Sequence, residues 1–418
     1  MPSETIQLEG HIIDSNSLGR VLDEIYASGA RFRILEVHIG QDPTARSYAT
    51  IEVSTDSQAT LQALLEQLAK QGAIWPTLED AELATADIDG AFPDDFYSTT
   101  NHETQVRYKD EWVEVRNPEM DCGLRFDSAS ASFSCVPMVH VRKGDQIVVG
   151  DRGVKVVLLE NERERGHFEF MSSEVTSEKP KPSSIRRVAA LMQQAKSEGK
   201  RLLLVGGPAI VHTDAAPHVV KLIERGYLHV IFAGNALAVH DIESNLFGTS
   251  LGVYLEKGTL ADTGHQHHLR AINTIRRAGG IKQAVETGIL TAGIMHACVK
   301  HNVEFVLAGS VRDDGPLPEV CTDVLVAQDR MRAALGNVGF VLMVATMLHS
   351  IATSNILPAS IPVACIDISS ATITKLVDRG GWQTIGVVTD VEPFFRELLE
   401  QLDVVEKRTR RRDKKSGG

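Results

Sequence analysis

Hydrophobic and polar residues alternate in two distinct ways along the first 178 residues of the chain. In residues 1–90, the stretches "QLEGHIIDS", "RFRILEVHIG" and "SYATIEVST" predict strands, and "SNSLGRVLDEIYASG" and "DSQATLQALLEQLAKQG" have the period of amphipathic helices. This β-α-β-β-α order predicts a small α+β domain of the ferredoxin-like kind. In residues 91–178, short strands separated by Gly and Asp turns indicate a small β-rich module.

The third part, residues 184–405, differs because its apolar runs are continuous. These runs are "RLLLVG", "LHVIFAG", "VEFVLAGS", "GFVLMVA", "PVACIDI" and "TIGVVTD". Strands that are apolar on both faces and separated by helices indicate a mostly parallel sheet with helices on both faces. The sequence therefore predicts an α/β fold with a C-terminal Rossmann-like domain, which follows a Pro- and Ser-rich linker at 177–184.

A basic tail ends the chain at residues 406–418, where seven of the nine residues from Lys407 to Lys415 are Lys or Arg. Such a run is typical of a solvated, disordered segment. Contact with an anion or with another subunit is the alternative.

The carboxyl ends of parallel strands meet at one edge of the sheet, which is where ligands of such folds bind. The residues that follow the six predicted strands are Gly206-Gly207-Pro208, Gly234-Asn235-Ala236, residues 309–315, Thr346–His349, Asp367 and Thr389-Asp390-Val391. Glycines and helix N-termini suit a phosphate, and aspartates suit ribose hydroxyls. The G-x-G-x-x-G fingerprint is absent from these turns, so the pattern predicts a nucleotide-type ligand without identifying it.

Composition and charge narrow the functional class. The 418 residues are 43% hydrophobic and 23% charged, which is ordinary for a globular protein. No apolar run is long enough to span a bilayer, and the opening "MPSETIQLEG" lacks the features of a secretory signal, so we expect no membrane partner. Five dispersed cysteines without CxxC spacing favour a reducing, cytoplasmic compartment. A net charge of −12 argues against a general nucleic-acid binder.

Several long stretches resemble one family. They are "VGGPAIVHT", "FAGNALAVHDIESNLFGTSLGV", "GHQHHLRAINTIR", "LAGSVRDDGPLPEV", "ATMLHSIATSNILP" and "VTDV". The chain is similar to the archaeal-type, NAD-dependent ornithine cyclodeaminases, which carry the LOR/SDH bifunctional-enzyme conserved region. This region also forms the C-terminal half of the cyanobacterial arginine dihydrolase/ornithine cyclodeaminases. The guanidine-hydrolysing module of those fused enzymes has no counterpart here, so arginine dihydrolysis is not expected.

The resemblance implies that L-ornithine is converted to L-proline and ammonia, with NAD as a retained cofactor that accepts a hydride and returns it. Two alternatives stay open. One is an NAD-dependent enzyme for another diamino acid or an opine-like amino acid. The other is a non-catalytic NAD- or amino-acid-binding regulator, because the ferredoxin-like first domain resembles amino-acid-sensing modules. A homo-oligomer is expected, of unspecified order.

The resemblance also implies a set of cofactor-binding residues at the strand ends. They are Asn235, Ala236, Asp314, Thr346, Met347, Leu348, His349, Asp367, Asp390 and Val391. For several of these the alternative is structural, because Asn, Asp and Thr often cap helices or shape turns.

Four residues are candidates for catalysis. His240 carries an imidazole, which exchanges protons near neutral pH, and its neighbour Asp241, or else Glu243, suits the distal ammonium of ornithine. Arg270 and Arg312 suit a bidentate grip on the α-carboxylate. The alternatives are helix-surface polarity and structural ion pairs.

Three histidines within the stretch "DTGHQHH" suggest a metal site, but no Cys or HExxH spacing supplies further ligands. We therefore expect no metal. The stretch is interpreted as a capped helix start or as a segment near the substrate or a subunit interface.

Overall fold

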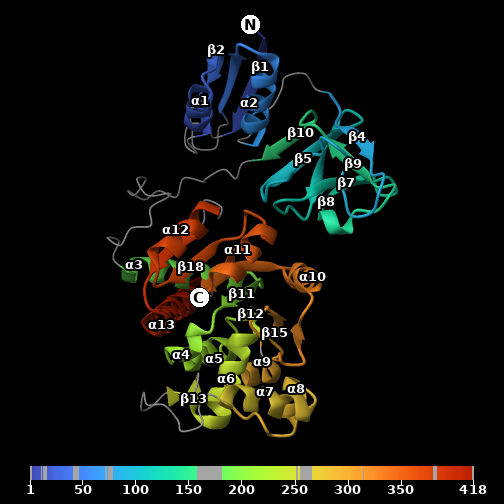
Figure 1. Cartoon of the computed structure of the whole chain (residues 1–418). Coiled ribbons are helices and arrows are strands. Elements are labelled where there is room, and N and C mark those ends of the chain that lie inside the picture. The colour runs from blue at the N-terminus through green and yellow to red at the C-terminus, as the bar shows by residue number, and fades with distance from the viewer. Residues whose placement is uncertain are drawn as a thin grey trace. The chain divides into compact units, whose positions relative to one another are not determined.

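The computed structural model describes residues 2–10, 12, 17–40, 47–70, 73, 79–157, 181–250, 253–254, 266–313, 315–379 and 384–416. The chain forms two compact units, Met1–Phe170 with Asn355–Ser360, and Met171–Ser354 with Ile361–Gly418. Figure 1 shows their helices and strands. No helix within these ranges is long and apolar enough to cross a membrane.

The first unit begins with a three-stranded antiparallel sheet in the order β1-β3-β2. Its elements are β1 (Ser3–Gly10), α1 (Ser17–Ala27), β2 (Arg31–His38), β3 (Ser47–Ser54) and α2 (Gln58–Lys70). Burial alternates along β3, where Ala49, Ile51 and Val53 face a core that includes Val21 and Ile25 of α1. The predicted β-α-β-β-α order is therefore observed.

A second sheet in the same unit has seven strands in the order β10-β5-β6-β8-β7-β9-β4. Its strands are β4 (Glu82–Thr85), β5 (Glu103–Tyr108), β6 (Glu111–Arg116), β7 (Gly123–Asp127), β8 (Ser132–Val136), β9 (Gln146–Val149) and β10 (Val154–Val157), with a 3₁₀ turn at Met138–His140. Its core includes Val106, Phe133 and Val148. Strand β4 pairs with β9 although it lies before residue 90, where the sequence predicted the β-rich module to begin.

The second unit is built on a sheet of seven parallel strands in the order β16-β15-β12-β11-β17-β18-β19. Its strands are β11 (Arg201–Gly206), β12 (Val230–Gly234), β15 (Glu304–Ala308), β16 (Val320–Cys321), β17 (Val338–Val344), β18 (Val363–Asp367) and β19 (Thr384–Val388). Residues 202–205 and 230–233 are buried throughout, as the continuous apolar runs predict. The predicted Rossmann-like architecture is confirmed.

Helices and one short hairpin complete this unit (Figure 1). The helices are α3 (Lys181–Ser197), α4 (Ala209–His212), α5 (Ala216–Glu224), α6 (Asn235–Phe247), α7 (His267–Ala278), α8 (Ile281–Glu286), α9 (Ile294–Lys300), α10 (Val324–Ala334), α11 (Met347–Ile356), α12 (Ser370–Arg379) and α13 (Val391–Ser416), and the hairpin is β13 (Thr249–Ser250) with β14 (Val253–Tyr254). Helix α6 is unusual because its first nine residues are buried almost without exception, charged side chains included.

Helix α13 continues to Ser416, through most of the segment 406–418 for which the sequence predicted a disordered tail. Buried Phe394, Phe395, Leu398 and Leu402 anchor the first half of this helix in the core. Since Lys and Arg favour helices, an anchored helix propagates readily through a basic segment.

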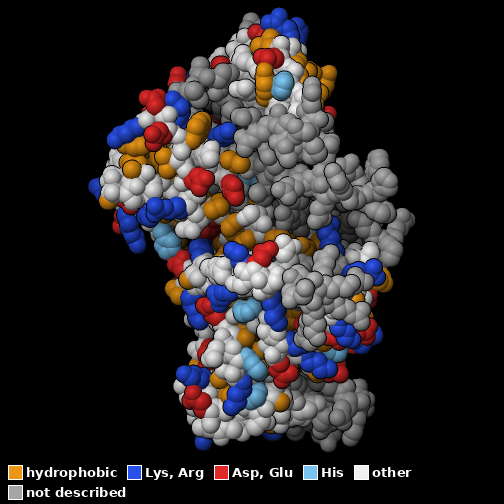
Figure 2. All heavy atoms as spheres, turned by 180° about the vertical axis from the view of Figure 1, so that it is seen from behind, with side chains coloured by type: hydrophobic (Ala, Val, Ile, Leu, Met, Phe, Trp, Pro, Cys, Tyr) orange, Lys and Arg blue, Asp and Glu red, His pale blue; other side chains and the backbone are white. Residues whose placement is uncertain are grey.

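Charged side chains of both signs are interspersed on the face of the molecule shown in Figure 2. Among the residues coloured there, no single sign covers the whole face. This pattern agrees with a chain that carries 43 basic and 55 acidic residues.

Candidate functional site

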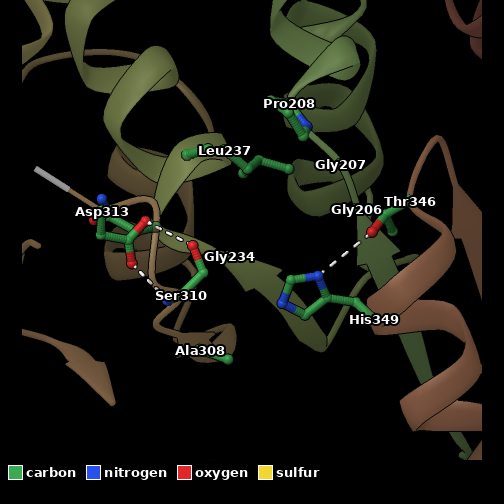
Figure 3. A pocket seen from close by; sticks show the side chains of 12 residues that line it. Gly206, Gly207, Pro208, Gly234, Leu237, Ala308, Ser310, Asp313, Thr346 and His349 are labelled. Carbon is green, nitrogen blue, oxygen red and sulfur yellow. Dashed lines mark hydrogen bonds between the residues drawn. The ribbon is translucent and has the colours of Figure 1, made fainter. Parts of the chain in front are cut away.

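A pocket opens at the carboxyl edge of the parallel sheet, where the strand order reverses between β11 and β17 (Figure 3). The chain runs outward from β11 to one side of the sheet and from β17 to the other, and this divergence leaves a crevice at the edge. The residues that line the pocket are Gly206, Gly207, Pro208, Gly234, Asn235, Ala236, Leu237, Ala308, Ser310, Asp313, Thr346 and His349. All of them follow or end β11, β12, β15 or β17.

Bare backbone forms much of the pocket wall. A Cβ atom on Gly207 would lie 1.9 Å from the carbonyl oxygen of Ala345, so no other residue fits there without displacing the end of β17. Ala345 itself has a φ of 51°, in the left-handed region. A Cβ on Gly234 would lie 3.2 Å from Cε1 of His349. The glycines thus keep the pocket open to a bulky group that must approach the backbone closely.

Helix α6 points its N-terminus into this pocket. Its first residues, Asn235 and Ala236, line the pocket, and Gly234 precedes them without any side-chain cap. The unpaired N–H groups and the positive end of the helix dipole are therefore available to an anion. The Asn235 side chain does not cap the helix, because its Oδ1 accepts the backbone N–H of Leu317 at 3.1 Å.

The opposite wall comes from the start of α11. His349 and Thr346 both line the pocket, with His349 Nδ1 3.4 Å from Thr346 Oγ1 (Figure 3). Burial lowers the pKa of His349, and the nearby Asp313 opposes this shift. The side chains of Met347 and Leu348 are 44% and 74% exposed and lie outside the pocket lining.

The loop after β15 is held in shape by Asp313, whose carboxylate accepts the backbone N–H of Ser310 at 2.8 Å. Arg312 is exposed in this loop and lies in sequence between Ser310 and Asp313, which both line the pocket. Asp314, the neighbouring candidate, lies outside the described residues.

Two aspartates end the next strands along the same edge. Asp367 closes β18 and its Oδ1 accepts the N–H of Ser369 at 2.8 Å. Asp390 follows β19 and its Oδ1 accepts the N–H of Val391 at 2.7 Å. Neither lines the pocket, but both lie in sheet order beyond β17, so they continue its edge.

A buried polar network starts at His240, in the second turn of α6. His240 Nδ1 lies 2.9 Å from Glu243 Oε2, and Glu243 Oε1 accepts the hydroxyl of Thr249 at 2.9 Å. The same hydroxyl lies 2.8 Å from Nδ1 of His267, whose ring stacks on Phe247. Glu243 and Thr249 are fully buried. The histidine-rich stretch thus contributes His267 to a network with α6.

A second histidine, His212 of α4, packs against this network. Its ring centroid lies 4.9 Å from that of His240, and its Nδ1 lies 2.7 Å from Ser250 Oγ. Burial and the neighbouring His240 lower the pKa of His212, while Glu243 raises it. The sequence did not single out His212, Thr249 or Ser250. They occur in the quoted family stretches, but no spacing relates them to His240.

The other catalytic candidates lie apart from the pocket lining. Asp241 is fully buried on α6, where its two oxygens accept the N–H groups of Ile294 and Met295. Arg270 is exposed on α7, where its Nη2 donates to Gln266 at 3.0 Å. Asp241 thus differs from the helix-surface polarity considered as its alternative, and Arg270 contacts a neutral amide rather than the ion-pair partner considered for it.

Known families cover almost the whole chain. The Rossmann-fold region of the C-terminal part of ArgZ-like arginine dihydrolases matches residues 186–398, and its first region matches residues 103–185. The LOR/SDH bifunctional enzyme conserved region matches residues 3–102. The ornithine cyclodeaminase of Methanothermobacter thermautotrophicus is 50% identical over 96% of this chain and 98% of its own. The chain belongs to the ornithine cyclodeaminase family.

Other relatives in this family include the ornithine cyclodeaminase of Methanocaldococcus jannaschii, which is 48% identical over 96% of both chains. The bifunctional arginine dihydrolase/ornithine cyclodeaminase ArgZ of Synechocystis is 38% identical over 96% of this chain but only 58% of its own. The present chain thus corresponds to little more than half of the fused enzyme.

Solved structures agree with the family assignment. Apo ArgZ superposes with a TM-score of 0.85 at 36% identity, over 97% of this chain and 59% of ArgZ. A LOR/SDH protein from Methanococcus maripaludis gives a TM-score of 0.73 at 47% identity, over 79% and 99%. A ternary complex of AgrE with ornithine and NAD⁺ gives 0.53 at 36% identity, over 97% and 58%.

Proposed function

We propose that this protein is an ornithine cyclodeaminase that converts L-ornithine to L-proline and ammonia with NAD as a retained cofactor. The observation that carries the proposal is its 50% identity, over nearly the full length of both chains, to an ornithine cyclodeaminase. The AgrE relative, solved with ornithine and NAD⁺, supports the choice of substrate and cofactor.

The pocket suits the pyrophosphate of a dinucleotide. Its floor at Gly207 and Gly234 lacks the Cβ atoms that would block a pyrophosphate, and the N-terminus of α6 offers unpaired N–H groups. Asp367 and Asp390 present carboxylates along the same edge, where ribose hydroxyls find acceptors. When bound, NAD accepts a hydride from the α-carbon of the amino acid and later returns it.

We propose that the residues implied by the family resemblance hold this cofactor. They are Asn235, Ala236, Asp314, Thr346, Met347, Leu348, His349, Asp367, Asp390 and Val391. Met347 and Leu348 would contribute backbone groups at the start of α11, because their side chains lie outside the pocket lining. His349 would act as a neutral donor or acceptor, since burial lowers its pKa.

The protein's own chemistry is proton transfer at two amines. His240 is the proposed acid–base group, and Glu243 orients it by accepting a hydrogen bond from Nδ1. Of the two arginines, Arg312 is the better placed to bind the α-carboxylate, because it lies in the loop whose Ser310 and Asp313 line the pocket.

The test is incubation of the protein with L-ornithine and NAD⁺. Proline and ammonia should form in equal amounts with no net production of NADH. Lysine and 2,4-diaminobutyrate serve as comparison substrates, because a longer or a shorter diamino acid cannot close the five-membered ring of proline. Accumulation of NADH with proline would contradict a retained cofactor.

Compartment and assembly are part of the same proposal. All five cysteines are free thiols, which supports a reducing cytoplasm as the place of action. We propose that the enzyme acts there as a homo-oligomer and supplies proline from ornithine.

A further inference from the structure

Two imidazoles, those of His212 and His240, pack against each other in the second unit. The rings of His212 and His240 lie 4.9 Å apart between centroids, at an interplanar angle of 57°. Each ring has its Nδ1 fixed, His212 by Ser250 at 2.7 Å and His240 by Glu243 at 2.9 Å. The Nε2 atom is therefore the one that each ring can offer to a substrate.

Helical geometry relates both histidines to the pocket wall. Pro208 and Ala236 line the pocket, and His212 and His240 follow them by four residues on α4 and α6. Residues four apart share a helix face. Each histidine is therefore one helical turn, or about 5.4 Å, further along its helix than a residue that lines the pocket.

The hydrogen-bond partners make the two imidazoles unequal. Glu243 is an acceptor when ionised, so Nδ1 of His240 carries a hydrogen. Thr249 gives its single hydroxyl hydrogen to Glu243 and therefore accepts from His267. The Nδ1 atom of His212 pairs with a neutral hydroxyl, that of Ser250. The two rings therefore differ in the partner at Nδ1, which is a carboxylate for His240 and a hydroxyl for His212.

We propose that His212 and His240 form a two-imidazole site for the ring closure of a diamino acid. His212 takes the proton of the distal ammonium, and His240 moves a proton between the two substrate nitrogens. This inference rests on the proposed function and adds His212 to it as a catalytic residue.

The proposed step begins at the distal amine of the substrate. The distal ammonium gives one proton to Nε2 of His212, and its freed electron pair forms a bond to the iminium α-carbon. His240 gives a proton to the original α-nitrogen and regains one from the newly bonded nitrogen. The electron pair freed on the newly bonded nitrogen then forms the C=N bond of a cyclic iminium, while the bond from carbon to the original α-nitrogen breaks and its electron pair leaves on ammonia. No oxidant or reductant takes part in this step.

The test compares His212→Gln with a matched control, His218→Gln. Like His212, His218 has a polar partner, since its Nε2 lies 3.3 Å from Glu392 Oε1, but it belongs to α5. In a single turnover of the NAD-loaded enzyme with ornithine, His212→Gln should form proline about 10²-fold more slowly. Reduced nicotinamide should accumulate meanwhile, because hydride removal does not use His212. His218→Gln should match the unaltered protein.

A second readout needs no turnover. In the protein without NAD, ornithine should shift the imidazole ring-hydrogen NMR signal that is lost in His212→Gln. Norvaline, which lacks the distal amine, should leave that signal in place. Ser250→Ala keeps the imidazole but frees Nδ1, and it should show the same accumulation of reduced nicotinamide with about a tenfold slower release of proline.

Equal loss of nicotinamide reduction and proline formation in both His212→Gln and Ser250→Ala would mark a structural role and overturn the inference. So would a His212→Gln protein that matches His218→Gln. Unaltered protein that forms no proline from ornithine would instead contradict the proposed function, so the two failures are distinguishable.

Discussion

Asp241 holds the N-terminus of α9 through Ile294. Its Oδ1 accepts the Ile294 N–H and its Oδ2 accepts the next N–H, from Met295, both at 2.8 Å. The carboxylate is fully buried and comes from α6, more than fifty residues earlier in the chain. A residue that the sequence offered for catalysis thus joins two helices.

Replacing Asp241 by Ala should destabilise the protein by about 2–4 kcal/mol, because two buried N–H groups lose their acceptor. Urea unfolding followed by circular dichroism measures the change. Asp323→Ala is the control: Asp323 caps α10 in the same way but near the surface, accepting from Leu325 and Val326. Its loss should cost about 1 kcal/mol. If both variants lose a similar amount of unfolding free energy, burial does not strengthen the contribution of Asp241 to stability.

The pH dependence of stability should also report on Asp241. Burial raises its pKa from 3.8 to about 6, while the two N–H bonds act in the opposite direction. Since the folded-state pKa lies above the unfolded one, the folded state binds the proton more tightly. The favourable contribution is complete below about pH 4 and is lost as pH rises through about 6. The total change is about 3 kcal/mol.

A comparison with Asp241→Asn isolates the contribution of Asp241 ionisation to stability, because the other carboxylates titrate equally in both proteins. The difference in unfolding free energy between the unaltered protein and Asp241→Asn should change with pH between about 4 and 6. A difference that is constant over this pH range would show that burial does not raise the pKa of the Asp241 carboxyl group.

The sequence predicted the parallel sheet because its strands are apolar on both faces, as at Leu203 and Ile231. It missed β16, whose two residues, Val320 and Cys321, are too few to show a pattern. It did not predict that α13 extends into the basic tail, because composition alone does not reveal that the same helix is anchored upstream by Phe394 and Leu402.

The pocket could be predicted from the sequence because topology brings all parallel strand ends to one edge. The histidine network could not, since it depends on side-chain contacts between α4, α6, β13 and α7. His240 and His267 are 27 residues apart and are joined through Thr249 and Glu243. Nothing in the spacing of these residues encodes that chain of contacts. The sequence also offered Arg270 for the α-carboxylate, because spacing does not reveal that its side chain is exposed and donates to Gln266.

Gly207→Ala should weaken NAD binding. The added Cβ would lie 1.9 Å from the carbonyl oxygen of Ala345, so the end of β17 or the turn after β11 must move. Overpacking of this kind costs about 1–3 kcal/mol of stability, and the displaced backbone narrows the pocket. Quenching of protein fluorescence by NAD⁺ should show at least about a tenfold weaker affinity, equal to about 1.4 kcal/mol.

Gly336→Ala is the control for this substitution. A Cβ there would meet only the carbonyl oxygen of Ala333, at 3.9 Å, which is ordinary contact. NAD affinity and stability should stay unchanged. Equal affinities for the two alanine variants would show that the cofactor does not use the turn at Gly207.

Glu243→Gln tests the role of the buried carboxylate in orienting His240. His240 and Thr249 contact different oxygens of Glu243, and the amide replaces one of these acceptors by an NH2 donor while keeping the shape of the side chain. Because Glu243 does not line the pocket, NAD affinity should be retained. The kcat for proline formation should fall about 10²-fold, since His240 loses the partner that fixes its tautomer.

The matched control is Glu286→Gln, an exposed residue whose Oε1 lies 3.9 Å from Lys282 on α8. Because this ion pair is exposed to solvent, its loss should change neither stability nor turnover measurably. A melting temperature recorded for each variant separates misfolding from a catalytic loss. If Glu243→Gln binds NAD, melts like the unaltered protein and still turns over at the full rate, the carboxylate does not orient a catalytic imidazole, and proton transfer at the substrate amines must come from another residue.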